Sequence, residues 1–354
     1  MTGTITAGEA TARRWDAVVV GAGPAGATAA RELARRGRSV LLVDKATFPR
    51  PKVCGCCLNG SALATLAAAG LGDLPGRCGA VPLTSTRLFA GGRAAVVRLP
   101  TGIALSRTAF DPALIHAAVE AGAAFLPGCR ADGQFSAGVT VRASGLAGAV
   151  AEGSRLGGGV IVPDPPAAYR VGVIHMAVGR GGYVGAVRLE DGRLDLAAAF
   201  DAAFVRASGG LGPAAADVLK QAGSPHIPGV ERLPWKGTPA LTRRPTTLAG
   251  PDWLAVGDAA GYVEPFTGEG MAWALASGVA AAELAADWHP GRAAEWERFY
   301  ARRMRPRRRV CRAAARVLRS PRLSGLIVRL LSVAPALARP VTRSLNRPLL
   351  PDLA

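Results

Sequence analysis

The sequence predicts an α/β protein in which a parallel sheet is joined to a β-rich part and followed by helices. Three features support this fold class. An apolar run near the start leads into a glycine-rich turn, a helical pattern and a second apolar run; the middle alternates β-like runs with glycine turns; and the last part is rich in alanine and arginine. The 354 residues can bury a sizeable core, and a hydrophobic content of 49% excludes general disorder.

The front of the chain carries a dinucleotide-binding pattern. DAVVV (16–20) predicts a strand buried in a parallel sheet, and it leads directly into GAGPAGATAARELARRG, where three glycines form G-x-G-x-x-G. The first glycine permits a tight turn, the second lets the backbone approach a pyrophosphate, and the third allows the helix to pack on the strand. The next strand, SVLLVD, ends in an acid near the spacing of a ribose ligand. A Rossmann-type domain is therefore predicted, with cofactor contacts at Gly21, Gly23, Ala25, Gly26, Asp44 and Lys45.

A second motif lies far downstream. DWLAVGDAAGYVEPFTGEGMAWALASGVAAAELAADW (252–288) predicts a short apolar strand, a Gly-Asp turn, a loop and a long alanine-rich helix. Asp258 follows the strand, where its carboxylate can accept a hydrogen bond from a cofactor hydroxyl. Gly268 and Gly270 stand at the start of the helix, where backbone amides can approach a flat ligand without side chains between them. This motif helps to decide which dinucleotide the chain binds.

Together, the two motifs resemble those of the FAD-dependent oxidoreductases related to p-hydroxybenzoate hydroxylase, which include aromatic hydroxylases, flavin halogenases and geranylgeranyl reductases. The Gly-Asp motif of that family matches Gly257 and Asp258, and PFTGEGM (265–271) matches the loop and helix that meet the flavin ring. The resemblance extends from about Trp15 to Trp288. It implies FAD as the cofactor, with contacts from this motif at Gly257, Asp258, Gly268, Gly270 and Met271.

A third segment, LSRTAFDPALIHAAVEAGAAF (105–125), resembles the R-x-x-x-D-x-x-L element of the same family. The resemblance implies that Arg107 contacts FAD, and we expect Asp111 to cap the helix that follows. One departure concerns the reductant, which we expect to be NADPH or NADH. Family hydroxylases carry an Asp-Gly motif linked to FAD and NADPH, whereas VRASGLAG (141–148) has Ser144 in place of the acid. This departure weakens the expectation of direct reduction by NADPH.

The segment FPRPKVCGCCLN (48–59) places three cysteines within four positions. It resembles the P-x-x-K-x-C-G-G signature of the geranylgeranyl reductases and halogenases, with Cys56 in place of the second glycine. No second pair of ligands has the spacing of a metal site, so we predict none. Cys54 and Cys57 have the spacing of a redox dithiol but lack the sequence context of a thioredoxin. We expect the cysteines to shape the flavin pocket, and the implied contacts with flavin, phosphate or substrate are Arg50, Lys52, Cys54 and Gly55.

The middle of the chain predicts a β-rich domain. TSTRLFAGGRAAVVRLP (84–100) indicates a hairpin around Gly91-Gly92, and further β-like runs follow with a turn at Asp191-Gly192. In the family that the chain resembles, such a sheet forms one wall of a substrate cavity, which implies a hydrophobic substrate with Trp235 and Phe266 in the lining. The expected units are a discontinuous FAD-binding domain (15–80, 105–150 and 238–290), a substrate domain (81–104 and 151–237) and a basic helical region (291–354).

The last part of the chain is strongly basic. From 301 to 351 there are 14 arginines and no Asp or Glu, in a chain whose formal net charge is +18. No nucleic-acid motif accompanies them, so we expect no nucleic-acid partner. GLIVRLLSVAPALA (325–338) is too short to span a membrane; we expect it to pack on the enzyme, with peripheral membrane contact as the alternative. The first residues lack the apolar core of a secretory signal, so we expect a cytoplasmic protein, with membrane association again the alternative.

The resemblance implies an FAD-dependent oxidoreductase. The activity expected from it is that of a monooxygenase, which hydroxylates a hydrophobic aromatic or polyketide-like small molecule through a flavin hydroperoxide. Two alternatives stay open. One is a geranylgeranyl-reductase-like flavoprotein that reduces C=C bonds of an isoprenoid or other lipid, for which Cys54 is the candidate proton donor. The other is a flavin-binding protein without catalysis.

Overall fold

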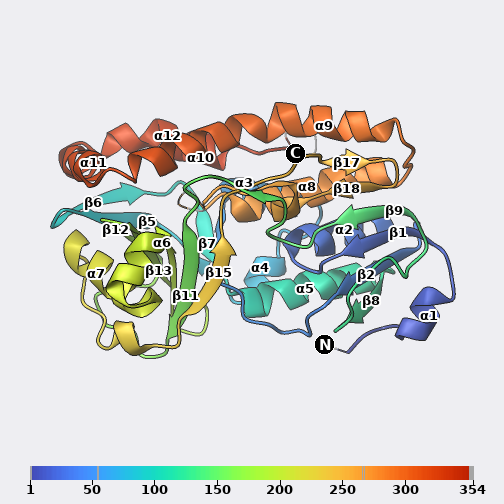
Figure 1. Cartoon of the computed structure of the whole chain (residues 1–354), viewed down its shortest axis with the longest axis horizontal. Helices are drawn as coiled ribbons and strands as arrows, with labels where there is room; N and C mark the ends of the chain where they lie inside the picture. Colours follow the sequence, from blue (N-terminus) through green and yellow to red (C-terminus); the bar gives the residue numbers. More distant parts are fainter. Residues whose placement is uncertain (1, 54–55, 265, 267, 351–354) are drawn as a thin grey trace.

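The computed structural model describes residues 2–53, 56–264, 266 and 268–350. Two large sheets lie side by side, and helices from the C-terminal part of the chain extend across both of them (Figure 1). The predicted α/β class, with a Rossmann-type domain, a β-rich domain and C-terminal helices, is confirmed.

The sheet of the Rossmann-type domain has the strand order β17-β18-β9-β1-β2-β8, and its pairs are parallel except β17 with β18. Every residue of β2 is buried, as the uninterrupted apolar run predicts. Helix α2 contacts both α5 and α8, and the approach to α8 is close because a Cβ on Gly278 would lie 2.4 Å from the carbonyl oxygen of Ala25. The elements are β1 (Trp15–Val20), α2 (Pro24–Ala34), β2 (Val40–Asp44), α5 (Arg107–Glu120), β8 (Ala124–Pro127), β9 (Ala137–Arg142), β17 (Ala249–Gly250), β18 (Trp253–Ala255) and α8 (Gly270–Ala285).

The second sheet has the order β15-β11-β14-β13-β12-β5-β6, with β5 and β12 parallel and the other neighbours antiparallel. The hairpin predicted around Gly91-Gly92 joins β5 to β6, and the turn predicted at Asp191-Gly192 joins β13 to β14. One face of the sheet packs on α7. The elements are β5 (Ser85–Ala90), β6 (Arg93–Arg98), β11 (Leu156–Val162), β12 (Val173–Gly179), β13 (Gly182–Arg188), β14 (Leu194–Phe200), α6 (Ala202–Ser208), α7 (Leu211–Ala222) and β15 (Lys236–Ala240).

Short elements connect the two sheets. A small sheet of order β3-β7-β4 carries the end of the cysteine segment, because β3 begins at Cys57. The remaining elements are α1 (Ala7–Thr11), β3 (Cys57–Asn59), α3 (Gly60–Ala68), α4 (Leu74–Arg77), β4 (Val81–Pro82), β7 (Gly102–Ala104), β10 (Ala149–Val150), η1 (Val230–Arg232), β16 (Arg243–Arg244) and η2 (Gly257–Ala260).

The C-terminal helices lie over the other face of the second sheet and reach back across the Rossmann-type domain (Figure 1). Helix α11 contacts β5, β6 and β12, and its Val328 joins a core cluster with Met176 and Val178. Within the described ranges, no single helix has both the length and the apolar composition to cross a membrane; the pair 321–333 and 335–346, bent by 118°, meets that test only together. The elements are α9 (Arg292–Arg303), α10 (Arg305–Val317), α11 (Pro321–Val333), η3 (Pro335–Ala338) and α12 (Arg339–Asn346).

Candidate functional site

The glycine-rich turn between β1 and α2 leaves no room for side chains. Gly21 has a φ of 107°, and a Cβ there would lie 2.3 Å from the carbonyl oxygen of Ala143. A Cβ on Gly26 would lie 1.8 Å from the carbonyl oxygen of Gly21, so only glycine lets α2 begin this close to the turn. Gly23 is the N-cap of α2 and borders a large cavity with the first residues of the helix. The turn therefore presents the amides and the positive dipole end of α2 to the cavity.

Asp44, at the end of β2, holds this turn in place. Its buried carboxylate accepts hydrogen bonds from the backbone amides of Ala22 and Ala46, at 2.7 and 2.8 Å. Arg50 Nη2 lies 3.7 Å from its Oδ2, whereas the neighbouring Lys45 is exposed. The carboxylate that the sequence predicts as a ribose ligand thus also supports the backbone of the glycine-rich turn.

Arg107 lies directly beside the turn. It is the first residue of α5, it is buried, and its Nη2 would lie 3.6 Å from a Cβ on Gly23. Asp111, one helical turn later and fully buried, accepts from Arg107 Nε and Nη2 at 2.6 and 2.8 Å. The prediction that Asp111 caps this helix is wrong: Ser106 is the N-cap, and its hydroxyl accepts from the amide of Ala109. Asp111 instead fixes the guanidinium of Arg107 at the cavity wall.

Lys52 adds a second cation to this part of the cavity. Its side chain has accessible surface because it borders the open cavity, yet protein surrounds it on the other sides. The resulting desolvation, and then the positive charge of Arg107, lower the pKa of the Lys52 ammonium, while Asp258 acts in the opposite direction. Its Nζ would lie 3.9 Å from a Cβ on Gly145, in the loop where Ser144 replaces the family's acid. The cluster can hold an anionic group between two cations.

The second sequence motif forms the facing wall. Gly257 has a φ of 59°, and a Cβ there would lie 2.9 Å from Ala25 Cβ, so η2 meets the start of α2 without an intervening side chain. The Gly257 amide donates to Ser277 Oγ of α8 at 2.9 Å. The structure thus brings the two motifs together across one cavity. From this motif, the described lining residues are Val256, Gly257, Asp258, Tyr262, Phe266, Gly268, Gly270, Met271 and Ala274.

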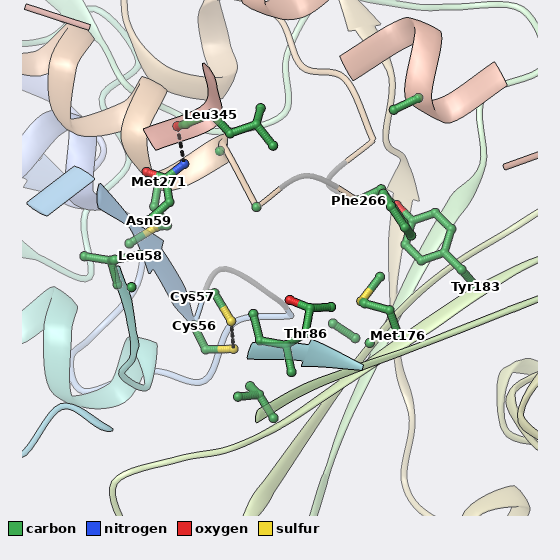
Figure 2. A pocket seen from close by; sticks show the side chains of 18 of the residues that line it. Cys56, Cys57, Leu58, Asn59, Thr86, Met176, Tyr183, Phe266, Met271 and Leu345 are labelled. Carbon is green, nitrogen blue, oxygen red and sulfur yellow. Dashed lines mark hydrogen bonds between the residues drawn. The ribbon is translucent and has the colours of Figure 1, made fainter. Parts of the chain in front are cut away.

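The cavity has a volume of about 880 Å³ and continues from the glycine-rich turn to the second sheet and the C-terminal helices. Figure 2 shows Met176, Tyr183 and Phe266 on one side and Met271 and Leu345 on the other. The rings of Tyr183 and Phe266 meet edge to face, with centroids 5.2 Å apart. Most of the lining away from the turn is aliphatic or aromatic, so this part suits an apolar ligand.

The cysteine segment reaches the same cavity. Cys56 and Cys57 line it, and their Sγ atoms lie 3.9 Å apart (Figure 2). Cys54, the predicted proton donor, and Gly55 lie outside the described residues. The predicted contacts Gly21, Gly26, Asp44, Lys45 and Arg50 stand behind or beside the turn, and none of these described residues is part of the cavity lining.

Trp235 does not occupy its predicted place in the substrate lining. Its indole packs with Leu211 against the opposite face of the second sheet, and its Nε1 donates to the carbonyl oxygen of Val230 at 2.8 Å. The physical reason is that the residue just before β15 is held by the turn of η1, which directs the ring away from the cavity. Phe266, the other predicted lining residue, does border the cavity.

Asp195 is a site residue that the sequence reasoning missed. It lies on β14, it is buried, and it lines the cavity. Burial raises the pKa of Asp195 to about 6, and a hydrogen bond from Cys56 opposes this rise. The sequence feature that could have identified Asp195 is its position as the single acid in the apolar strand LDLAAAF. A carboxylate buried in such a strand requires a partner or a function.

Two buried acids, Glu264 and Glu269, flank residues 265–268, and each is paired with an arginine of the C-terminal region. Glu269 Oε1 accepts from Arg307 Nη1 at 2.6 Å, and the same nitrogen donates to the carbonyl oxygen of Leu345 in α12 at 3.1 Å. Glu264 Oε1 accepts from Arg155 Nη1 at 3.1 Å, and its Oε2 lies 3.6 Å from Nη2 of Arg319, between α10 and α11. Burial raises the pKa of each carboxyl, and the neighbouring arginines oppose the rise. The C-terminal helices thus support the wall formed by the second motif.

The residues of this cavity fit FAD. Gly21, Gly26 and Gly257 leave no room for a Cβ. The amide end of α2 and two cations face the cavity at one end, and an apolar chamber lies at the other. The chain also matches the family model described as FAD binding domain over residues 14–149. The front motif, the second motif and the family model therefore agree on the cofactor.

Comparison with known proteins finds both reductases and halogenases among the proteins similar to the chain. It is 30% identical over 325 residues to a menaquinone reductase of Mycolicibacterium smegmatis, covering 77% of this chain and 76% of that one. It is 27% identical over 312 residues to digeranylgeranylglycerophospholipid reductase 1 of Methanothermobacter thermautotrophicus, covering 77% of each. A geranylgeranyl bacteriochlorophyll reductase-like protein of Thermoplasma acidophilum shares the fold, with a TM-score of 0.75 at 19% identity over 97% of this chain and all of that one. The chain therefore belongs to the FAD-dependent oxidoreductases of the p-hydroxybenzoate hydroxylase-like superfamily, in the branch that includes geranylgeranyl reductases, flavin monooxygenases and halogenases.

Proposed function

We propose that the protein is a reductase that saturates a C=C bond in the isoprenoid chain of a lipid, with FAD as its resident cofactor. The observation that carries the proposal is one continuous cavity, which joins the cofactor-binding turn to a long apolar chamber bordered by the C-terminal helices. Two relatives support this substrate class. One is a menaquinone reductase and the other a digeranylgeranylglycerophospholipid reductase, and both of these lipids carry isoprenoid chains. Hydroxylation, the activity expected first from the sequence, uses the same cofactor, and the experiment below separates the two reactions.

Residues on both walls would hold the cofactor. The amides at the start of α2 and the guanidinium of Arg107 suit its pyrophosphate, and Asp258 suits a ribityl hydroxyl. The glycines at the start of α8 suit the flat ring, and Lys52 offers a further positive charge beside it. When bound and reduced, FAD supplies a hydride to a carbon atom. We propose NADPH or NADH as the source of these electrons.

The apolar chamber selects the substrate and excludes water. Leu88, Val97, Ile174 and Met176 line it from the second sheet, and Leu331 lines it from α11. A methyl-branched hydrocarbon chain can lie along these side chains without burying an unpaired polar group. The same walls keep water from the reacting carbon atoms, which favours transfer to the substrate over side reactions.

Asp195 is our proposed proton donor. Reduction of a C=C bond adds a hydride to one carbon and a proton to the other, so the chamber needs an acid. With its pKa at about 6, Asp195 keeps its proton at pH values where an ordinary aspartate has lost it. Its thiol neighbour Cys56, which donates a hydrogen bond to it, holds the carboxyl group in the wall. The side chain can thus offer a proton to a substrate carbon in the chamber.

The test uses the purified holoenzyme, reduced with dithionite without oxygen and then given menaquinone or geranylgeraniol in detergent. Dithionite alone reduces the menaquinone ring to the quinol, which also adds two hydrogen atoms, so each extract is reoxidised in air before analysis. After this step, mass spectrometry detects reduction of one C=C bond as a product 2 mass units heavier, and a sample without enzyme should give none. The proposal fails if no such product forms with either compound. A product 16 mass units heavier, formed only when oxygen and a reductant are both supplied, would show hydroxylation instead.

A further inference from the structure

Exposed apolar side chains gather on the last helices. Val333 is 83% exposed and Leu326 61%, although both belong to helix α11, whose opposite side packs on the second sheet. Together with neighbouring residues they form what we call the portal surface, which extends over α11, η3 and α12. Its exposed large apolar residues are Leu323, Leu326, Ile327, Leu330, Val333, Leu337 and Val341. A surface of this kind on a folded protein marks a site of interaction.

The portal surface is also the mouth of the substrate cavity. Ile327 and Leu330 of α11, and Leu337 and Val341 beyond the bend, line the cavity and are exposed to solvent as well. A side chain that has both properties must lie where the cavity opens. The 118° bend between 321–333 and 335–346 sets the two helical segments on either side of this opening. The cavity is thus reached between apolar side chains.

The charge around the mouth is positive. Arg322 and Arg329 on α11, and Arg339 and Arg343 beyond the bend, are exposed among the apolar residues. Between 301 and 350 the sequence contains no Asp or Glu that could neutralise them. Short helices with exposed leucine and valine beside arginine favour the boundary between the acyl chains and the headgroups of an anionic membrane. Arginine side chains can extend from there to the phosphates while the apolar residues enter the hydrocarbon.

We propose that the portal surface inserts into the interfacial layer of an anionic bilayer, and that the mouth of the cavity opens toward the acyl chains. A lipid substrate would then slide from the bilayer into the chamber without crossing water. The role in substrate entry rests on the proposed function, whereas insertion into the bilayer does not. The energetic reason is that an isoprenoid chain leaves one apolar environment directly for another.

The test is flotation of the holoenzyme with vesicles of phosphatidylcholine alone or with phosphatidylglycerol at about one third. The variant is Leu326→Glu with Val333→Glu, since both side chains are exposed and neither lines the cavity. The matched control is Val150→Glu with Val171→Glu, which places the same two charges at exposed valines, 53% and 62% accessible, outside the C-terminal helices. The wild type and the control should float with the anionic vesicles, and the double variant should bind them at least about tenfold more weakly.

Retention of FAD, read from the visible spectrum, shows whether each variant is folded. If the double glutamate variant loses its flavin, Leu326→Ser with Val333→Ser replaces it, with an expected loss of binding of about threefold or more. Equal flotation of folded variant and wild type would overturn the proposal. So would a wild-type dimer in light scattering that the variant converts to a monomer, because a second copy would then cover the face. These assays involve no turnover, so they stand apart from the mass-spectrometric test of the reductase.

Discussion

The replacement Asp195→Asn should lower activity and raise stability in the same protein. Asparagine keeps the shape of the carboxyl group and can accept the hydrogen bond from Cys56, but it can neither donate an acidic proton nor ionise. The pKa of Asp195 rises from 3.8 to about 6 in the folded protein. At 1.36 kcal/mol for each pH unit, ionisation of the native side chain costs about 3 kcal/mol of folding free energy.

The pH dependence follows from the direction of this change. Because the folded pKa is the higher one, the protonated carboxyl costs nothing below about pH 4, and the penalty develops as the pH rises through about 6. The variant should therefore be more stable than the wild type by about 3 kcal/mol at pH 8 and by less than about 1 kcal/mol at pH 4. Urea unfolding of the holoenzyme at the two pH values measures this difference. Turnover should fall by about a hundredfold, since proton transfer by a positioned acid contributes at least that much.

Asp217→Asn is the matched control. Asp217 is exposed on α7, where its carboxylate accepts from Ser208 Oγ, so this variant should change stability by no more than about 0.5 kcal/mol and leave turnover unchanged. Unaltered turnover of Asp195→Asn on a saturable substrate would refute the role of Asp195 as proton donor. A stability difference that does not change between pH 4 and 8 would refute the account of its ionisation.

Three further predictions concern the cofactor wall. Gly26→Ala should abolish FAD retention, read as the flavin-to-protein absorbance ratio, because its Cβ would lie 1.8 Å from a carbonyl oxygen; Gly8→Ala, with open space around it, should retain full flavin. Asp111→Ala leaves the buried guanidinium of Arg107 without its carboxylate and should cost about 3–5 kcal/mol in urea unfolding with a weaker Kd for FAD; an unchanged Kd would contradict the role given to this pair. Arg307→Ala leaves the buried carboxylate of Glu269 without its cation, so the free energy of unfolding should fall by about 1–3 kcal/mol; no loss would contradict the support ascribed to the C-terminal helices.

The ion pair at Glu269 also connects the cofactor wall to the last helix. Arg307 joins the start of α8, at the cofactor wall, to the carbonyl oxygen of Leu345 in α12. Because one guanidinium makes both contacts, a shift of α12 at a membrane would act on the same side chain that supports the cofactor wall. The arrangement gives the basic C-terminal region a structural task in addition to its surface charge.

The sequence patterns that predicted the local structure correctly are those in which residues close together in the chain determine the backbone conformation. A strand followed by G-x-G-x-x-G requires a turn that only glycine can form, and β-like runs around Gly91-Gly92 or Asp191-Gly192 require hairpins. Asp111 shows the limit of such reasoning. Its spacing from Arg107 fits either a helix start or an i to i+4 pair, and the choice depends on where the helix begins, which Ser106 decides.

By itself, the sequence determined the α/β class, the FAD-binding motifs and the oxidoreductase family, because each rests on residues whose backbone conformation or ligand chemistry is local. Only the tertiary structure decided what surrounds the chamber. In the tertiary structure, Trp235 points away from the chamber, and Asp195, on a strand about 140 residues after Cys56, lies beside that cysteine. Helices α11 and α12 lie around the mouth of the cavity. The direction in which a strand faces, and the depth at which its side chains are buried, depend on contacts between segments far apart in the chain, and these contacts leave no local pattern.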